Sequence, residues 1–92
     1  MSVVRIPPVL RAQAGGHKKL EVEGETVGAV LGNLVALYPG LRDQLFTAEG
    51  ALHRFVNVYV DGQHVRDTGE LATPVGRGDD VVILPAMAGG DG

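Results

Sequence analysis

The sequence predicts an α+β fold in which one long helix covers one face of a mixed β-sheet. Three observations support this prediction. One segment carries apolar residues at helical spacing, several short segments are rich in β-branched residues, and strand-like segments both precede and follow the helix. Strands on both sides of a single helix in the chain are typical of a two-layer arrangement. With 92 residues, the chain is expected to form one domain.

The N-terminal part of the chain predicts a β-hairpin formed by residues 3–10 and 17–23. The first segment is rich in β-branched residues, and its Pro7-Pro8 pair restricts it to an edge, a bulge or the end of a strand. Ala14-Gly15-Gly16 signals the turn. In the second segment leucine and valine alternate with charged residues, so one side of that strand is apolar.

A single helix is expected to begin after Thr26, whose side chain can accept a backbone N–H from the first turn. The apolar positions that follow are spaced as one helical stripe: Val27, Val30, Leu31, Leu34, Leu37 and Tyr38. Gly28 and Gly32 weaken the helix, and we expect them to allow its close approach to the sheet. Pro39-Gly40 ends the helix.

The second half of the chain contains three further strand signals. The expected elements are a short helical turn at 41–45, a strand at 55–60, a tight turn at Asp61-Gly62, a short returning strand at 63–66, a loop over 67–78 and a last strand at 81–84. The order of strands around one helix is that of the β-grasp arrangement. Residues 1–86 are therefore expected to form the domain, and residues 87–92 a flexible tail.

The net charge of −3 and the pI near 5.4 provide no basic surface for nucleic acid. The chain has no cysteine, which excludes disulfides, thiolate metal sites and a cysteine nucleophile. No segment has the apolar core of a signal peptide or the length of a membrane span. We therefore expect a cytoplasmic protein that binds neither nucleic acid nor membranes.

The chain closes with a slim tail that follows directly from the last strand. It reads Ala86-Met87-Ala88-Gly89-Gly90-Asp91-Gly92. Glycine has no Cβ, so a glycine pair can enter a channel too narrow for side chains. A carboxylate on such a stem can be delivered into another enzyme while the folded body stays outside. The tail therefore predicts a carrier whose own C-terminus is the reactive group.

Other candidate sites carry less weight. His17, His53 and His64 match no metal-binding spacing, so we expect no metal and a solvent-exposed, structurally neutral role for each. The Asp79-Asp80 pair resembles a catalytic dyad, but it more simply forms the polar turn that starts the last strand. We expect no catalytic residue in this chain.

Alternation in the strands also predicts a partner surface. If the valines of strand 55–60 face the helix, Phe55 and Tyr59 point the other way, and so do Val82 and Leu84 of the last strand. These four residues are the candidate partner interface. The alternative is that loops 41–52 and 67–78 cover this face.

The chain resembles the ubiquitin-like sulfur carrier proteins of the MoaD/ThiS family, and most of all the branch that carries sulfide for cysteine synthesis. The resemblance extends over nearly the whole chain. It is carried by residues 52–62, by Gly-Asp-Asp, an apolar strand and a proline at 78–85, and by Ala88-Gly89-Gly90. The order of these motifs near the C-terminus makes the resemblance specific.

The resemblance implies that the carrier is a protein co-substrate and not an enzyme. A ubiquitin-activating-like adenylating enzyme would use ATP to activate the terminal glycine, and sulfide would then form a thiocarboxylate; the carrier itself would bind no cofactor. A cysteine synthase, a thiosugar synthase or another biosynthetic enzyme would accept the tail, of which Met87, Ala88, Gly89 and Gly90 are the binding residues. A zinc metalloprotease of the JAMM type would cleave the carrier–cysteine adduct.

Asp91 and Gly92 depart from the pattern, because carriers of this group typically end at the second glycine. Either a protease, for which the zinc metalloprotease is the candidate, exposes Gly90 as the reactive terminus, or Gly92 is used directly. Two alternative functions share this fold and tail. One is a ubiquitin-like modifier that is joined to lysines, and the other is the small subunit of a molybdopterin synthase.

Overall fold

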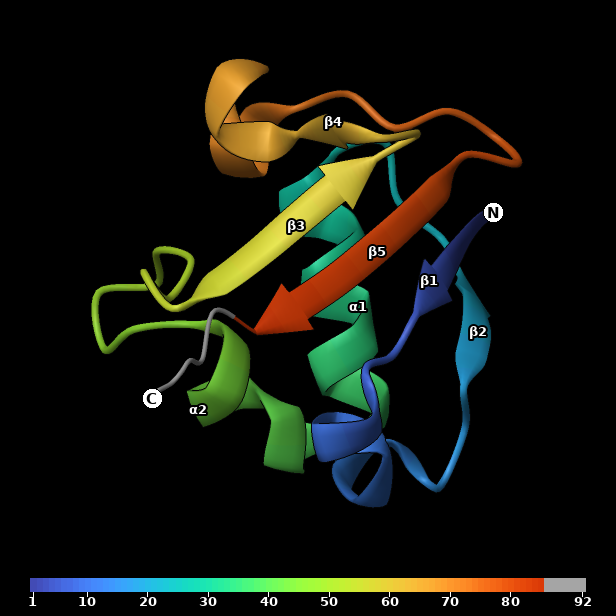
Figure 1. The fold of residues 1–92 in the computed structure, drawn as a ribbon, viewed down its shortest axis with the longest axis vertical. Coiled ribbons are helices and arrows are strands. Elements are labelled where there is room, and N and C mark those ends of the chain that lie inside the picture. Colours follow the sequence, from blue (N-terminus) through green and yellow to red (C-terminus); the bar gives the residue numbers. More distant parts are fainter. Residues whose placement is uncertain (86–92) are drawn as a thin grey trace.

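Five strands form one mixed sheet in the order β2-β1-β5-β3-β4, and α1 lies across one of its faces (Figure 1). The structure is a computed structural model that describes residues 1–85. Its strands are β1 (Ser2–Arg5), β2 (Lys19–Val22), β3 (Val56–Val60), β4 (Gln63–His64) and β5 (Asp80–Pro85), and its α-helices are α1 (Val27–Leu37) and α2 (Arg42–Leu45). β1 and β5 are parallel, whereas the other three neighbouring pairs are antiparallel. The predicted β-grasp fold is confirmed.

The predicted hairpin at the N-terminus is present, but its first strand is shorter than expected. β1 ends before the proline pair, and Pro8–Ala14 form a 3-10 helix instead of continuing the strand to residue 10. Pro7 is extended, and the proline after it occupies the first helical position, where a missing N–H leaves no bond unmade. As a result Leu10 is buried, whereas Val9 points to solvent and is 59% exposed.

The helix prediction is confirmed at its start and needs correction at its end. The Thr26 hydroxyl accepts a hydrogen bond from the Ala29 backbone N–H at 3.1 Å, as expected for a capping residue. The residues of α1 that are buried are Val27, Val30, Leu31, Leu34 and Val35. Leu37, which the stripe included, is instead 62% exposed. Val35 is buried in the core, and Phe46, from the chain that follows the helix, packs against the same core.

The two helix glycines do not face the sheet as expected. A Cβ at Gly28 would lie 3.1 Å from the backbone oxygen of Leu71, whereas a Cβ at Gly32 would have nothing within 4 Å. The close approach at Gly28 is therefore to the 3-10 helix Glu70–Ala72, which lies in the loop before β5. The glycine is needed there because an added methyl group would press on a backbone carbonyl.

The loops contain more regular structure than the sequence indicated. Short 3-10 helices occur at Pro39–Leu41, Val65–Asp67 and Glu70–Ala72. The first of these leads into α2, as predicted for 41–45. The second begins inside the predicted strand 63–66, so β4 is only two residues long.

β5 occupies the centre of the sheet and carries the tail. It pairs with β1 on one side and with β3 on the other. Val81 and Ile83 of β5 are buried against the same core as Val58 of β3. Figure 1 shows β5 running between β1 and β3, with α1 behind the sheet. The tail therefore begins at the end of the central strand, which pairs with a neighbouring strand along each edge.

Candidate functional site

The outer face of the sheet carries three of the four predicted interface residues on paired strands. Tyr59 lies opposite Val82 in the β3–β5 ladder, and Leu84 lies opposite Asn57. The alternate residues of both strands are buried: Val56, Val58, Val60, Val81 and Ile83. The predicted direction of these side chains is confirmed, because successive residues of a strand point to opposite faces.

Loops 41–52 and 67–78, which could have covered the outer face, pack on the helix side of the sheet. Phe46 and Leu52 of loop 41–52, and Leu71 of loop 67–78, are partly buried against the hydrophobic core. Their apolar side chains therefore join the helix side of the sheet. Leu84 is 46% exposed on the outer face, and Tyr59 and Val82 are half-buried. The outer face consequently presents an apolar stripe along the last half of β5.

A polar cluster limits this stripe on the side of β4. The Nε2 atom of His64 lies 2.8 Å from the side-chain oxygen of Asn57, and the imidazole contacts Tyr59 edge-on at 4.8 Å between ring centroids. The Nδ1 atom of His64 accepts the backbone N–H of Arg66 at 3.1 Å. A neutral imidazole with an accepting Nδ1 carries its proton on Nε2, which then donates to Asn57. His64 therefore orients Tyr59. The expectation that this histidine has no structural role needs correction.

His53 also has a local structural role. Its Nδ1 atom accepts the backbone N–H of Phe55 at 3.4 Å, and the two rings lie 5.4 Å apart. The Arg54 guanidinium lies 5.6 Å from the centroid of the same phenyl ring. Phe55 is 57% exposed and lies one residue before β3. Among the predicted interface residues, it is the one that lies away from the stripe on β5, at the end of the sheet where β5 finishes.

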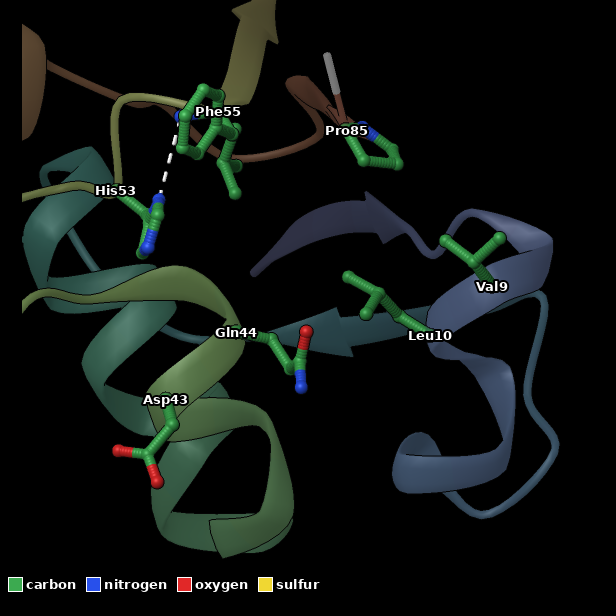
Figure 2. A pocket seen from close by; sticks show the side chains of 8 residues that line it. Val9, Leu10, Asp43, Gln44, His53, Phe55 and Pro85 are labelled. Atoms are coloured by element: carbon green, nitrogen blue, oxygen red, sulfur yellow. Dashed lines mark hydrogen bonds between the residues drawn. The ribbon is translucent and has the colours of Figure 1, made fainter. Parts of the chain in front are cut away.

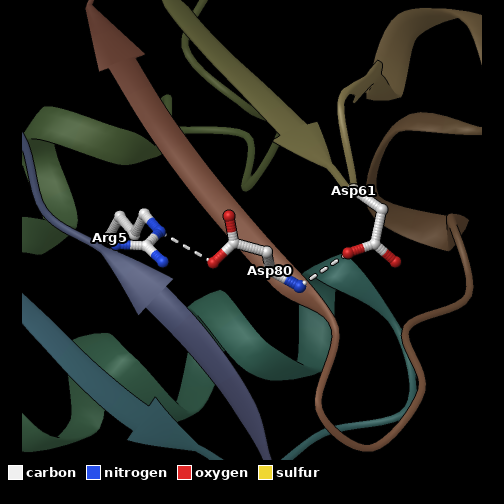
Figure 3. Close-up of polar contacts among 3 residues, drawn as sticks. All are labelled: Arg5, Asp61 and Asp80. Carbon is white, nitrogen blue, oxygen red and sulfur yellow. Dashed lines mark hydrogen bonds and ion pairs between the residues drawn. The ribbon is translucent and has the colours of Figure 1, made fainter.

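The acidic pair lies at the turn that starts β5, as predicted. The Asp79 carboxylate accepts the backbone N–H of Gly76 at 2.7 Å. The Asp80 carboxylate accepts from the guanidinium Nε of Arg5 at 2.8 Å, and the Asp80 backbone N–H donates to the Asp61 carboxylate at 2.9 Å (Figure 3). Each carboxylate therefore has a partner that holds the start of β5 in place.

A groove lies at the opposite end of β5, where the described chain stops (Figure 2). It has a volume of 290 Å³, and its apolar lining is formed by Val9, Leu10, Phe55, Val56 and Pro85. Asp43 and Gln44 of α2, and His53, contribute polar groups to the lining. The groove was missed from the sequence because residues 3–10 were interpreted as one strand. Pro8 at a possible first helical position was the signal that could have indicated otherwise.

The reactive tail itself lies outside the described residues. The predicted binding residues Met87, Ala88, Gly89 and Gly90 all follow Pro85, the last residue that the structure describes. Within residues 1–85, no group of three or more His, Cys, Asp or Glu side chains is placed to hold a metal ion. No helix of that part of the chain has the length and apolar character needed to cross a membrane.

Comparisons with known proteins agree with the predicted resemblance. The chain matches the ThiS family over residues 4–90. It is 48% identical to the sulfur carrier protein CysO of Mycobacterium tuberculosis over 89 residues, which are 95% of this chain and 96% of that protein. The crystal structure of the same CysO matches with a TM-score of 0.88 and 45% identity, over 95% of this chain and 100% of the other.

Two further relatives bear on partners and on alternatives. A chain in the crystal structure of the BexX/CysO complex of Amycolatopsis orientalis matches with a TM-score of 0.91 and 41% identity, over 98% of this chain and 100% of that one. Small archaeal modifier protein 3 of Haloferax volcanii is 40% identical over 65 residues, which are 71% of this chain and 70% of that protein. The relatives thus include both sulfur carrier proteins and a modifier protein.

Proposed function

This chain belongs to the ThiS family and is a CysO-like sulfur carrier, and on that premise we propose that it carries sulfur as a thiocarboxylate on Gly90. The observation that supports this residue most directly is the extent of the family match, which runs from residue 4 to residue 90 and stops at the second glycine. The protein is a co-substrate that other enzymes act on, and its site of action is the cytoplasm.

The proposed chemistry proceeds in two steps. An adenylating enzyme joins the Gly90 carboxylate to the α-phosphate of ATP, which releases pyrophosphate and forms an acyl-adenylate. Sulfide, supplied by a sulfurtransferase partner, then attacks the acyl carbon and displaces AMP. The product is a thiocarboxylate with a nucleophilic sulfur. Activation is required because a carboxylate oxygen is a poor leaving group, whereas AMP is a good one.

The fold supports delivery of this group into a partner. The residues from Ala86 to Gly90 span at most roughly 17 Å when extended, so the reacting group can enter a deep pocket while the body stays outside. The outer-face residues Val82 and Leu84 lie on β5, the strand that leads into the tail, and Tyr59 lies beside them on β3. We propose that they contact the adenylating enzyme, and that Phe55 extends this interface toward the groove.

The sulfur acceptor is proposed to be a biosynthetic enzyme that binds the same tail. The likeness to a chain of the BexX/CysO complex supports such a partner, since that structure joins a carrier to another protein. A cysteine synthase or a thiosugar synthase would take sulfur from the thiocarboxylate. A zinc metalloprotease of the JAMM type is the proposed enzyme that removes Asp91 and Gly92 and exposes Gly90.

The test uses a chain that ends at Gly90, incubated with the adenylating enzyme, ATP and a sulfide source. The intact mass should show replacement of one terminal oxygen by sulfur. A matched chain that ends at Ala88 lacks the glycine pair and should show no change. If the adenylating enzyme converts another carrier but leaves the Gly90 form unchanged, the proposal is wrong.

The relative in Haloferax volcanii supports a second candidate function, conjugation of Gly90 to lysines of target proteins. The two functions differ in the products found in cell extracts. Conjugation predicts a ladder of larger species that resist reducing agents, whereas sulfur transfer alone predicts a single free band. An immunoblot of extract, with the Ala88-ended chain as the control, separates them.

A further inference from the structure

The groove at the end of β5 is built from three distant parts of the chain. Val9 comes from the first 3-10 helix, Phe55 from the segment before β3, and Pro85 from the end of β5. Val9 and Phe55 are 59% and 57% exposed, although both are large and apolar. Figure 2 shows the side chains of Leu10 and Gln44 pointing toward one another across the hollow. Exposed apolar surface of this kind often marks a binding site.

We propose that this groove binds the side chain of Met87, from the chain's own tail, when the carrier is free of partners. Pro85 lines the groove and is followed directly by Ala86 and Met87. Two residues span at most about 7 Å, so Met87 cannot lie far from the groove, which begins at Pro85. Among the residues after Pro85, Met87 is the one large apolar side chain in the sequence.

The chemistry of the groove suits a methionine. Its side chain is unbranched and polarizable, so it fills irregular apolar spaces and makes favourable contacts between sulfur and aromatic rings. Phe55 offers such a ring on the rim. The backbone of Ala86 and Met87 also needs hydrogen-bond partners, and the Gln44 amide beside the hollow has both a donor and an acceptor.

The chain's own tail has an advantage over a separate ligand. A group tethered by two residues has an effective concentration in the millimolar range, which exceeds the concentration of most free partners. A second copy of the chain or a partner side chain would have to displace Met87 to reach the same hollow. These other occupants are therefore outcomes of the test.

Docking of Met87 has a consequence for transfer, and this consequence rests on the proposed function. With Met87 held on the body, only the residues from Ala88 to Gly90 extend beyond it, and they reach at most about 10 Å. A partner that draws the tail into its channel must first release Met87. The docked state thus keeps the reacting group close to the carrier between enzymes.

The experiment observes the two methionine methyl groups by NMR in the free full-length chain, labelled with ¹³C at the methionine methyls. The Met87 methyl should show contacts to the Phe55 ring and to the Val9 methyls, and a shift caused by the ring current. Phe55→Ala should return it to the position seen in a short peptide of the tail sequence. Met1 is the internal control, and its methyl should not move.

Two further variants keep the result interpretable. Leu37→Ala removes an equally exposed apolar side chain on α1, and it should leave the Met87 methyl unchanged. Val9→Asp places a charge on the groove rim and should release Met87 without removing a ring, which covers the case in which Phe55→Ala does not fold. A well-dispersed amide spectrum establishes the fold of each variant.

Two results would overturn the proposal. One is a Met87 methyl that already matches the peptide in the unaltered chain and does not respond to either groove variant. The other is contacts that appear only between differently labelled chains in a mixed sample, because a second copy would then occupy the groove. None of these measurements needs an adenylating enzyme. A result against docking of Met87 would therefore not bear on the thiocarboxylate proposal.

Discussion

The two ends of β5 are built on opposite principles. At its start, Asp80 and its neighbours form a network of charged and polar bonds to Arg5, Asp61 and Gly76. At its end, Pro85 lines an apolar groove and leads into the tail. The start therefore has specific bonds that are directional, while the end has apolar surface that any complementary group can cover.

This difference suits a strand that must present a reacting group. Polar bonds at the start set the register of β5 between β1 and β3, because a slip by one residue would break them and reverse the faces of Val81 and Val82. The end can then change its contacts without disturbing the sheet. In a carrier, the start of β5, which we call the fixed end, stabilises the fold. The end at Pro85, which we call the open end, is available to partners.

The largest expected effect concerns residues beyond the open end. The 92-residue chain should form thiocarboxylate at least about 100-fold more slowly than the chain ending at Gly90. Asp91 and Gly92 move the carboxylate roughly 7 Å past its expected position and add a negative charge near the phosphates of ATP. Intact mass spectrometry measures both rates. Equal rates, with Gly92 retained in the product, would make Gly92 the working terminus.

A substitution on the outer face near the open end should have the next largest effect. Leu84→Asp should weaken binding to the adenylating enzyme by about tenfold or more, since an apolar interface would bury an unpaired carboxylate. Its fold should remain intact because Leu84 is exposed. Titration calorimetry and thermal unfolding measure the two quantities. Leu37→Asp on α1 is the matched control. An equal loss of affinity in that variant would show that the effect is not specific to the outer face.

At the fixed end, Asp61→Ala should lower the free energy of unfolding by about 1 kcal/mol without changing partner binding. The variant loses the acceptor for the Asp80 backbone N–H. It also places alanine at a φ of 49°, a left-handed conformation that aspartate and asparagine tolerate better. Asp61→Asn keeps both features and should retain most of the stability. Urea unfolding of the three proteins makes the comparison, and a loss in Asp61→Asn as large as in Asp61→Ala would contradict it.

The smallest expected effect is that of the ion pair. Arg5→Ala should lower the free energy of unfolding by less than about 1 kcal/mol, and the loss should shrink as salt is added. Both side chains of the pair are well exposed, at 53% for Arg5 and 40% for Asp80. The same urea experiment at low and high salt measures this. A loss greater than that of Asp61→Ala would mean that the pair, and not the turn, holds the start of β5.

Much of the stripe on the outer face could be predicted from the sequence, and the groove could not. The strict alternation of β3 places Val58 inside and Tyr59 outside wherever the strand lies in the sheet. The groove depends on Val9, whose position follows from a 3-10 helix that an extended interpretation of the same residues concealed. A β-branched segment interrupted by prolines favours both readings, and only packing distinguishes them.

Local chemistry in the sequence determined the elements that depend on neighbouring residues. The capped start of α1 at Thr26 and the Asp61-Gly62 turn, with both residues at positive φ, need only bonds and dihedral preferences within a few residues. Tertiary structure alone decided the pairing of Arg5 with Asp80, which are 75 residues apart, and the exposure of Leu37 in place of Val35. Such contacts depend on which strands lie side by side and where the chain folds back, and burial of the whole core sets both.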